Sequence, residues 1–266
     1  MKSQRFVFFS FVLLVTAVSN MNGQIVRQGI PDKTVILTFD DAVISQYNFV
    51  APLLKKHGFG ATFYICEFPP NFGDTTKYMD WQMIKKLDNM GFEIANHTRT
   101  HPAVAKLTKE ELLKELNYIE DKCEELGIKK PETFAYPGYS LSEGVIDVLS
   151  EKGYRFARAG GSRVYKPESD YPLLVPSWAM NAENKPQIME ALRQAGKGKI
   201  VVLTIHGVPD IEHPWVNTPP ELFEEYVNYL SENDFTVIAL RDMKKYMDVE
   251  KAMNNLTADL TKPLKN

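Results

Sequence analysis

Short apolar runs alternate with longer stretches of helical periodicity along most of this chain, and this alternation restricts the fold more than any other feature. The runs at 35–39 (VILTF) and 199–205 (KIVVLTI) are apolar at almost every position, which is typical of strands buried on both faces. We expect strands at 35–39, 61–65, 92–95, 133–136, 155–159, 173–175, 199–205 and 235–239. Seven or so parallel strands with helices between them, and no linker or internal repeat, predict a single α/β domain. Periodicity does not separate a barrel from an open sheet, but the length of 266 residues favours a distorted (β/α) barrel.

The segments between these strands are expected to be helical. We predict helices at 43–57, 79–90, 108–126, 143–152, 186–195 and 221–232. The start of the third helix carries a capping box, because the Thr108 hydroxyl can accept from a backbone amide three residues on while Glu111 reaches back. Gly127 is expected to end that helix.

Residues 1–23 have the pattern of a secretory signal peptide. Lys2 and Arg5 precede an apolar run at 6–19, which is shorter than the roughly 20 residues needed to span a bilayer. Cleavage is expected after Ser19 or Gly23, so that 24–266 would form the mature catalytic domain with no membrane span. The protein is then expected in the periplasm or secreted. The alternative is that the segment stays as an uncleaved anchor.

Charge and cysteine content exclude several classes of protein. The chain has 31 basic and 34 acidic side chains, and its net charge of -3 gives no reason to expect a nucleic acid or an anionic membrane as partner. No glycine-rich nucleotide loop follows an expected strand. A Cys66–Cys123 bridge is allowed in an oxidising compartment, but Cys123 falls in an apolar helix stripe, so we expect buried free thiols. Nothing in the sequence indicates the oligomeric state.

Polar side chains gather where the expected strands end. Asp40 and Asp41 follow the first strand, His97 and His101 follow the third, and His206 follows the run at 199–205. In parallel α/β folds the carboxyl ends of strands face the reaction cleft, so we expect these side chains to lie together. A carboxylate and two imidazoles suit a divalent transition metal, and a second aspartate could take a proton from water. Taken singly, each group has an ordinary explanation, such as a turn, a helix cap or a core histidine.

Three segments resemble motifs of the polysaccharide deacetylase family, also called the NodB-homology or carbohydrate esterase 4 family. They are 38–41 (TFDD), 96–101 (NHTRTH) and 203–206 (LTIH), in the family's order and in matching strand contexts. The resemblance covers about 33–247. It implies a distorted (β/α) barrel and hydrolysis of N-acetyl groups on amino sugars or, in some members, of O-acetyl esters.

The resemblance also implies roles for individual residues. Asp40 would be the catalytic base and His206 the general acid. Asp41, His97 and His101 would hold one divalent metal ion, usually zinc. The residues expected to contact substrate are Gly138, Tyr139, Trp178 and Leu203, with Leu203 lining the pocket for the acetyl methyl group.

Two departures from the family pattern bear on activity. The third motif normally carries an arginine that braces the base, and Ala135 stands in its place, although Gly138 keeps the backbone N–H expected to face the oxyanion. The fourth motif supplies Trp178 but no aspartate to orient the acid histidine. We hypothesise that Arg158, on the next strand, replaces the missing arginine; the alternative is a solvated arginine.

The sequence therefore predicts an exported, metal-dependent hydrolase that removes N-acetyl groups from a peptidoglycan- or chitin-like polymer or oligomer. Its expected partner is an acetylated glycan. Two alternatives stay open at this stage. One is an enzyme of the same fold that cleaves O-acetyl esters or a non-sugar amide, and the other is a glycan-binding protein without catalysis.

Overall fold

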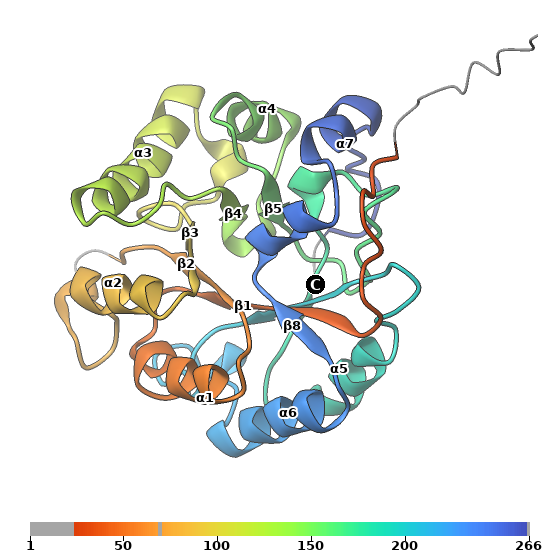
Figure 1. Ribbon diagram of the computed structural model, residues 1–266. Helices are drawn as coiled ribbons and strands as arrows, with labels where there is room; N and C mark the ends of the chain where they lie inside the picture. The colour runs from red at the N-terminus through yellow and green to blue at the C-terminus, as the bar shows by residue number, and fades with distance from the viewer. Residues whose placement is uncertain (1–23, 69–70, 265–266) are drawn as a thin grey trace, which may run out of the picture.

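The computed structural model describes residues 24–68 and 71–264, so the predicted signal peptide lies outside the described residues. Eight parallel strands form one curved sheet in the order β5-β4-β3-β2-β1-β7-β6, with β8 also paired to β1 (Figure 1). The strands are β1 (Thr34–Asp40), β2 (Thr62–Ile65), β3 (Glu93–Asn96), β4 (Thr133–Ala135), β5 (Phe156–Arg158), β6 (Trp178–Ala179), β7 (Val201–Ile205) and β8 (Thr236–Ile238). The predicted single-domain distorted barrel is confirmed.

The ends of the sheet approach each other between β5 and the segment before β6. Val175 forms a parallel bridge with Arg158, and its backbone bonds both Ala157 (2.8 Å) and Ala159 (2.7 Å). The chain then continues into β6, which pairs with β7. The carboxyl ends of β1, β3, β5 and β7 are therefore held around one opening.

Helices surround the strands, as Figure 1 shows. They are α1 (Ala51–Lys56), α2 (Trp81–Asn89), α3 (Lys109–Glu125), α4 (Glu143–Glu151), α5 (Lys185–Leu192), α6 (Pro220–Glu232) and α7 (Val249–Asn255). The predicted capping box is present. The Thr108 hydroxyl accepts from the backbone amide of Glu111, and the backbone amide of Thr108 donates to the Glu111 carboxylate. Helix α7 had no counterpart among the sequence predictions. No helix in the described part of the chain is long and apolar enough to cross a membrane.

One predicted strand is wrong. The run at 173–175 does not form a strand; Pro172–Leu174 is a 3₁₀ turn, and the strand of this region, β6, lies three residues further on. Proline has no N–H to give to a ladder and its fixed φ suits the first turn of a helix, so Pro172 favours the turn. Because β6 ends at Ala179, the residues that follow its carboxyl end differ from those that follow the predicted strand.

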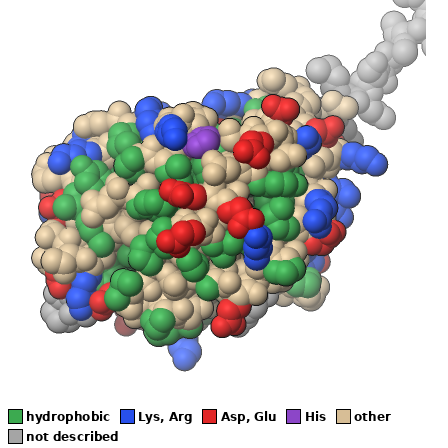
Figure 2. Space-filling view, turned by 90° about the horizontal axis from the view of Figure 1, so that it is seen from below, with side chains coloured by type: hydrophobic (Ala, Val, Ile, Leu, Met, Phe, Trp, Pro, Cys, Tyr) green, Lys and Arg blue, Asp and Glu red, His purple; other side chains and the backbone are tan. Residues whose placement is uncertain are grey.

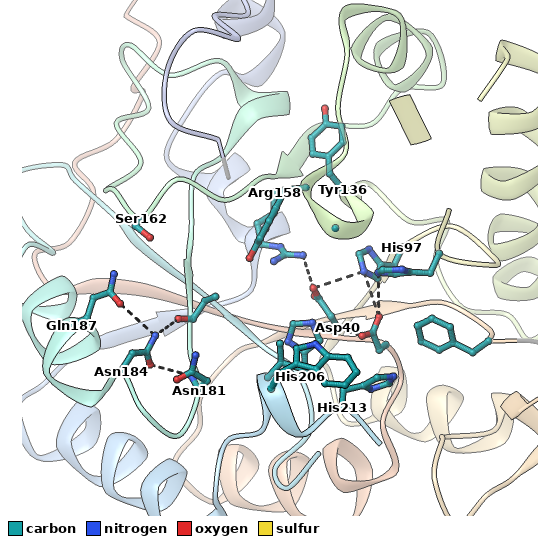
Figure 3. A pocket seen from close by; sticks show the side chains of 18 residues that line it. Asp40, His97, Tyr136, Arg158, Ser162, Asn181, Asn184, Gln187, His206 and His213 are labelled. Atoms are coloured by element: carbon teal, nitrogen blue, oxygen red, sulfur yellow. Dashed lines mark hydrogen bonds and ion pairs between the residues drawn. The ribbon is translucent and has the colours of Figure 1, made fainter. Parts of the chain in front are cut away.

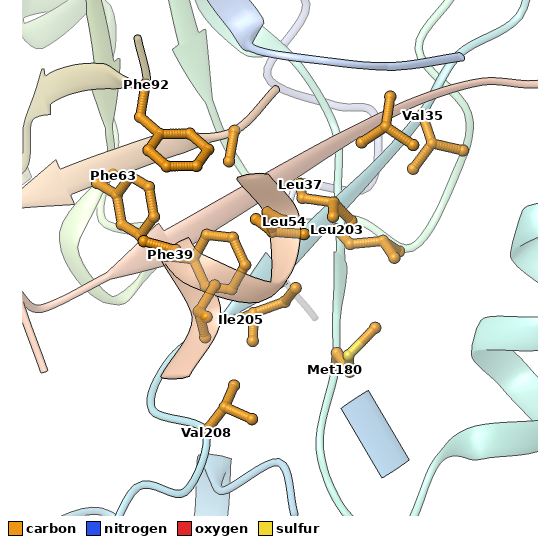
Figure 4. Packing of buried hydrophobic residues seen from close by; sticks show 14 of the residues in the cluster. Val35, Leu37, Phe39, Leu54, Phe63, Phe92, Met180, Leu203, Ile205 and Val208 are labelled. Carbon is orange, nitrogen blue, oxygen red and sulfur yellow. The ribbon is translucent and has the colours of Figure 1, made fainter. Parts of the chain in front are cut away.

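Alternation along the strands separates two layers of core. Val35, Leu37 and Phe39 of β1 point outward, where they pack with β2, β7 and the helices (Figure 4). The rings of Phe39 and Phe63 stack with centroids 5.1 Å apart. The other side of β1 faces the barrel interior, where Ile36 packs in a separate cluster and Asp40 ends the row. This period of two sets which side chains can enter the site.

A buried carboxylate, that of Glu93 at the start of β3, lies at the amino-terminal end of the strands. Glu93 accepts from the hydroxyls of Thr62 (2.7 Å) and Thr133 (2.8 Å) and from the backbone amide of Arg241 (2.9 Å). These bonds satisfy a charge that burial would otherwise make costly. The opposite, carboxyl-terminal end is the one left open.

Both cysteines are buried free thiols, as predicted. On the face shown in Figure 2, acidic and basic side chains are interspersed, as the near-neutral composition leads one to expect.

Candidate active site

A cavity of about 670 Å³ opens at the carboxyl ends of the strands, within the range typical of small-molecule sites (Figure 3). The carboxylate, imidazole and guanidinium groups of its wall come from distant parts of the sequence. They are Asp40, Asp41, His97, His101, Arg158, His206 and His213. The five strand-end residues predicted from sequence therefore line one cavity.

Asp40 sits at the end of β1, where the inward direction of its side chain follows from the strand alternation. It is 3% exposed, and its Oδ2 accepts from Nη2 of Arg158 at 2.7 Å. The other carboxylate oxygen, Oδ1, is buried and has no hydrogen-bond partner among the described residues. Burial by itself would raise the pKa of Asp40, but Arg158 and the nearby imidazoles together hold it below its ordinary value. The carboxylate is thus ionised, with one oxygen free to accept a proton.

Asp41, His97 and His101 form a compact group of possible metal ligands. One ligand atom from each lies within 4.8 Å of the others. Oδ1 of Asp41 is 3.5 Å from Nε2 of His97 and 3.8 Å from Nε2 of His101. Asp41 and His101 have φ values of 74° and 55°, a left-handed conformation that non-glycine residues adopt at a cost. The backbone is therefore strained at Asp41 and His101, two of the three possible ligands.

The chemistry of this group fits a divalent cation. Nδ1 of His97 lies 2.8 Å from the carbonyl oxygen of Ala135, so the N–H is placed there and Nε2 keeps its lone pair for a metal. Burial lowers the pKa of His97 to about 3, which keeps the ring neutral. Burial and the neighbouring Asp40 raise the pKa of Asp41, a cost that a bound cation would offset. Cys66 adds a weak thiol donor to Asp41 Oδ1 at 3.6 Å.

His206 follows β7 and faces the same group from the other side. Its Nε2 is 3.7 Å from Oδ2 of Asp41, and its side chain is 18% exposed. The buried amide of Gln46 donates to the carbonyl oxygens of both Asp40 and His206, which ties the ends of β1 and β7 together. Burial lowers the pKa of His206, while the carboxylates of Asp40 and Asp210 act in the opposite direction.

Arg158 reaches Asp40 from β5. The register pairs Ala135 of β4 with Arg158, so the two residues are neighbours across the ladder on the inward face. The guanidinium is 1% exposed, donates to Asp40 and to the hydroxyl of Thr204, and lies 5.3 Å from the ring centroid of Tyr64. The predicted approach of Arg158 to Asp40 is confirmed, and the solvated alternative is wrong.

The four expected substrate-contacting residues divide into two pairs. Gly138 and Tyr139 line the cavity, on the turn Pro137–Tyr139 after β4. Trp178 and Leu203 do not line it: they are 4% and 0% exposed and belong to the outer core. The two residues are paired in the β6–β7 ladder, and their side chains lie on the face of the sheet opposite to the inward-pointing Thr204. Strand alternation thus turns Leu203 away from the site.

Several cavity residues were not predicted from the sequence. Asn181, Asn184 and Gln187 form an amide-rich wall after β6, seen on the left of Figure 3. Polar residues after a strand end are the signal that identifies them, but the sequence predicts a strand at 173–175, whereas β6 is at Trp178–Ala179. Gln46 gave a weaker signal, as a polar residue on the buried side of a predicted helix.

Part of the chain matches a known protein family. The family model described as "Polysaccharide deacetylase" matches residues 27–157. The peptidoglycan-N-acetylmuramic acid deacetylase PdaC of Bacillus subtilis (strain 168) is 25% identical over 228 residues, which cover 82% of this chain and 41% of that protein. A chitin deacetylase of Arthroderma benhamiae is 27% identical over 141 residues, covering 52% and 36%. The chain spans less than half the length of these curated relatives.

Solved structures share the fold over most of the chain. Bacillus subtilis PdaA, a family 4 carbohydrate esterase, gives a TM-score of 0.56 at 21% identity, covering 80% of this chain and 81% of that one. The Bc1960 peptidoglycan N-acetylglucosamine deacetylase gives 0.57 at 18% identity, covering 81% and 90%. BA3943 of Bacillus anthracis, described as a pseudoenzyme of the same family, gives 0.55 at 19%, covering 82% and 66%. At such identities the likeness establishes the fold.

Proposed function

Since residues 27–157 of this chain belong to the polysaccharide deacetylase family, we propose that the protein is a metal-dependent hydrolase that removes N-acetyl groups from an amino-sugar polymer or oligomer. The named deacetylases among its relatives act on acetylated glycans, which supports this substrate class. The residues proposed to hold the metal, with zinc as the expected ion, are Asp41, His97 and His101. A bound divalent metal would supply Lewis-acid polarisation of the acetyl carbonyl and a lowered pKa for water.

The protein groups have distinct tasks in this proposal. Asp40 takes a proton from the attacking water through its unpartnered Oδ1, while Arg158 holds the other oxygen. The water oxygen adds to the acetyl carbon, and the backbone N–H of Gly138 is proposed to face the oxygen that gains charge. The C–N bond then breaks as His206 gives a proton to the departing amine, and acetate leaves.

One observation carries the proposal. A buried, ionised carboxylate with one oxygen held and the other free lies next to a compact Asp–His–His group in a single cavity. A buried carboxylate oxygen without a hydrogen-bond partner is costly, so the unpartnered Oδ1 of Asp40 indicates a role other than the ion pair with Arg158. The arrangement matches what base-assisted hydrolysis requires.

Acetate release tests the proposal directly. The purified protein, loaded with a divalent metal, should release acetate from N-acetylglucosamine oligomers or peptidoglycan fragments. Asp40→Asn should remove nearly all of this activity and Asp88→Asn, a change on the surface of α2, should leave it intact. Full activity in Asp40→Asn would refute the assigned base, and no acetate from any glycan would place the chain with non-catalytic relatives such as the BA3943 pseudoenzyme.

We also propose that the enzyme works outside the cytoplasm. The support is the secretory pattern of residues 1–23 and the peptidoglycan substrates of named relatives. Amino-terminal sequencing of the protein recovered from an expressing cell's export fraction should begin at Asn20 or Gln24.

A further inference from the structure

Trp215 is the most prominent aromatic side chain at the mouth of the cavity. It lines the cavity yet is 71% exposed, whereas Trp178 is 4% exposed and Trp81 is held by a bond from Nε1 to Glu67. Leaving a large ring in water forgoes the stabilisation that burial would give. Folding therefore does not explain its position.

The loop that carries Trp215 is held in place. The buried carboxylate of Asp210 accepts from the backbone amides of Gly207 (3.1 Å) and His213 (2.9 Å), and its own amide donates to the side chain of Asn217. The ring of Trp215 meets that of His213 edge to face, with centroids 5.5 Å apart. A ring fixed in this way loses little conformational entropy when a ligand stacks on it.

The amide-rich wall of Asn181, Asn184 and Gln187 lies beside this loop, because the backbone amide of Ala182 donates to the carbonyl oxygen of Asn217 at 2.9 Å (Figure 3). The side chain of Asn184 holds this segment together. Its Nδ2 donates to the backbone carbonyl of Ala179, and its Oδ1 accepts from the backbone amide of Asn181. The other two side chains use their carboxamide oxygens: Oδ1 of Asn181 accepts from the backbone amide of Glu183 (2.9 Å), and Oε1 of Gln187 lies 3.5 Å from Nδ2 of Asn184. Neutral amides are suitable partners for hydroxyl and acetamide groups.

The charges of the cavity restrict its ligand further. Among the described residues that line it, the one arginine is Arg158 and there is no lysine, and Arg158 is already paired with Asp40. The nearby cations Lys77 and Arg99 are paired with Glu212 and Glu67. A sugar carboxylate would therefore find no free cationic side chain in the described wall.

We propose that Trp215, together with Asn181 and Gln187, forms a second subsite that binds an uncharged N-acetylhexosamine unit next to the one that is deacetylated. One face of the sugar ring stacks on the indole, and its polar edge meets the amides. This inference rests on the proposed deacetylase function and specifies its substrate as a neutral oligomer rather than a monomer or a chain with carboxylates.

Chain-length dependence of acetate release is the first test. The kcat/KM of the metal-loaded protein should rise about tenfold from N-acetylglucosamine to its trimer, the gain expected from one good aromatic contact. Trp215→Ala should bring the trimer-to-monomer ratio close to one, and Trp215→Phe should restore most of it. Ile211→Ala is the matched control, since Ile211 is 76% exposed on the same loop but does not line the cavity. An unchanged ratio in Trp215→Ala would overturn the subsite.

A binding measurement separates this inference from the proposed chemistry. Chitotriose added to the Asp40→Asn protein should shift the emission of the exposed indole, and the shift should be absent in Asp40→Asn/Trp215→Phe. An oligomer of alternating N-acetylglucosamine and N-acetylmuramic acid should bind at least about tenfold more weakly, since its carboxylates lack a cationic partner. A shift that persists without Trp215, or equal binding of the acidic oligomer, would refute the subsite. If the metal-loaded protein without substitutions released no acetate while the emission shift was intact, the proposed chemistry would be refuted and the subsite would stand.

Discussion

The guanidinium of Arg158 and the carboxylate of Asp40 form an ion pair inside the barrel, with 2.7 Å between Nη2 and Oδ2, although 118 residues separate them in sequence. Ala135, which stands where the related family carries its bracing arginine, is the direct ladder neighbour of Arg158. Strand β5 thus supplies, through Arg158, the positive charge that β4 lacks at Ala135. We propose that Arg158 positions the base and keeps it ionised.

Removing Arg158 should harm both activity and stability. Arg158→Ala leaves Asp40 buried without its cation, and breaking a buried pair in this way typically costs about 3–5 kcal/mol. The free energy of unfolding should fall by that order, and acetate release should drop by about 100-fold or more because the base loses its orientation. Denaturant titration and steady-state kinetics measure the two effects.

The double variant Ala135→Arg/Arg158→Ala provides the sharper test. It moves the guanidinium back across the ladder, and we expect it to recover part of the lost activity. Arg155→Ala is the control, because Arg155 precedes the same strand but forms an exposed pair with Glu250. Activity in Arg158→Ala equal to that of the parent would exclude a positioning role.

Metal binding should depend on the Asp–His–His group. The protein should take up one divalent ion, and zinc should raise its melting temperature in a concentration-dependent way. His101→Gln and Asp41→Asn should each weaken binding by at least about tenfold, as measured by calorimetry. His57→Gln, at the end of α1 away from the cavity, should bind like the parent. Retention of full affinity in both ligand variants would show that the metal binds elsewhere.

The metal-free protein should lose stability in mild acid. Burial lowers the pKa of His97 to about 3, against an ordinary value of 6.5, so between these values the unfolded chain binds a proton that the folded chain does not. Stability is therefore lost as pH falls from 6.5, at up to about 1.4 kcal/mol per pH unit for this group. His97→Gln should flatten the dependence in chelator-treated samples. An identical slope in both proteins would show that His97 is not the titrating group.

Asp210 should stabilise the loop that carries Trp215. Its carboxylate accepts two backbone amides and lies 3.2 Å from Nδ1 of His213. Asp210→Ala would leave these donors unsatisfied in a buried place, at a cost of about 1–3 kcal/mol. Amide hydrogen exchange should accelerate in the loop after β7. Glu212→Gln, on the same loop but in a surface pair with Lys77, should leave exchange unchanged; equal protection in the Asp210 variant would contradict the anchoring role.

The sequence alone determined the parallel α/β class, because runs apolar at every position must be buried on both faces. It also determined that Asp40, Asp41, His97, His101 and His206 meet, since parallel strands bring their carboxyl ends to one opening. These inferences need the strand period and the direction of the chain, which are local properties.

Tertiary structure decided the remaining features. Whether Arg158 replaces the arginine missing at Ala135 depends on the β4–β5 register, which the sequence of either strand does not reveal. Trp178 faces the outer core because β6 begins at this residue, after the turn at Pro172–Leu174, and pairs it with the outward-pointing Leu203 of β7. A shift in the position of a strand also changes which residues follow its end. The same shift concealed the amide-rich wall beside the Trp215 loop. Pairing between strands that are distant in sequence fixed these side chains, and no local pattern records that pairing.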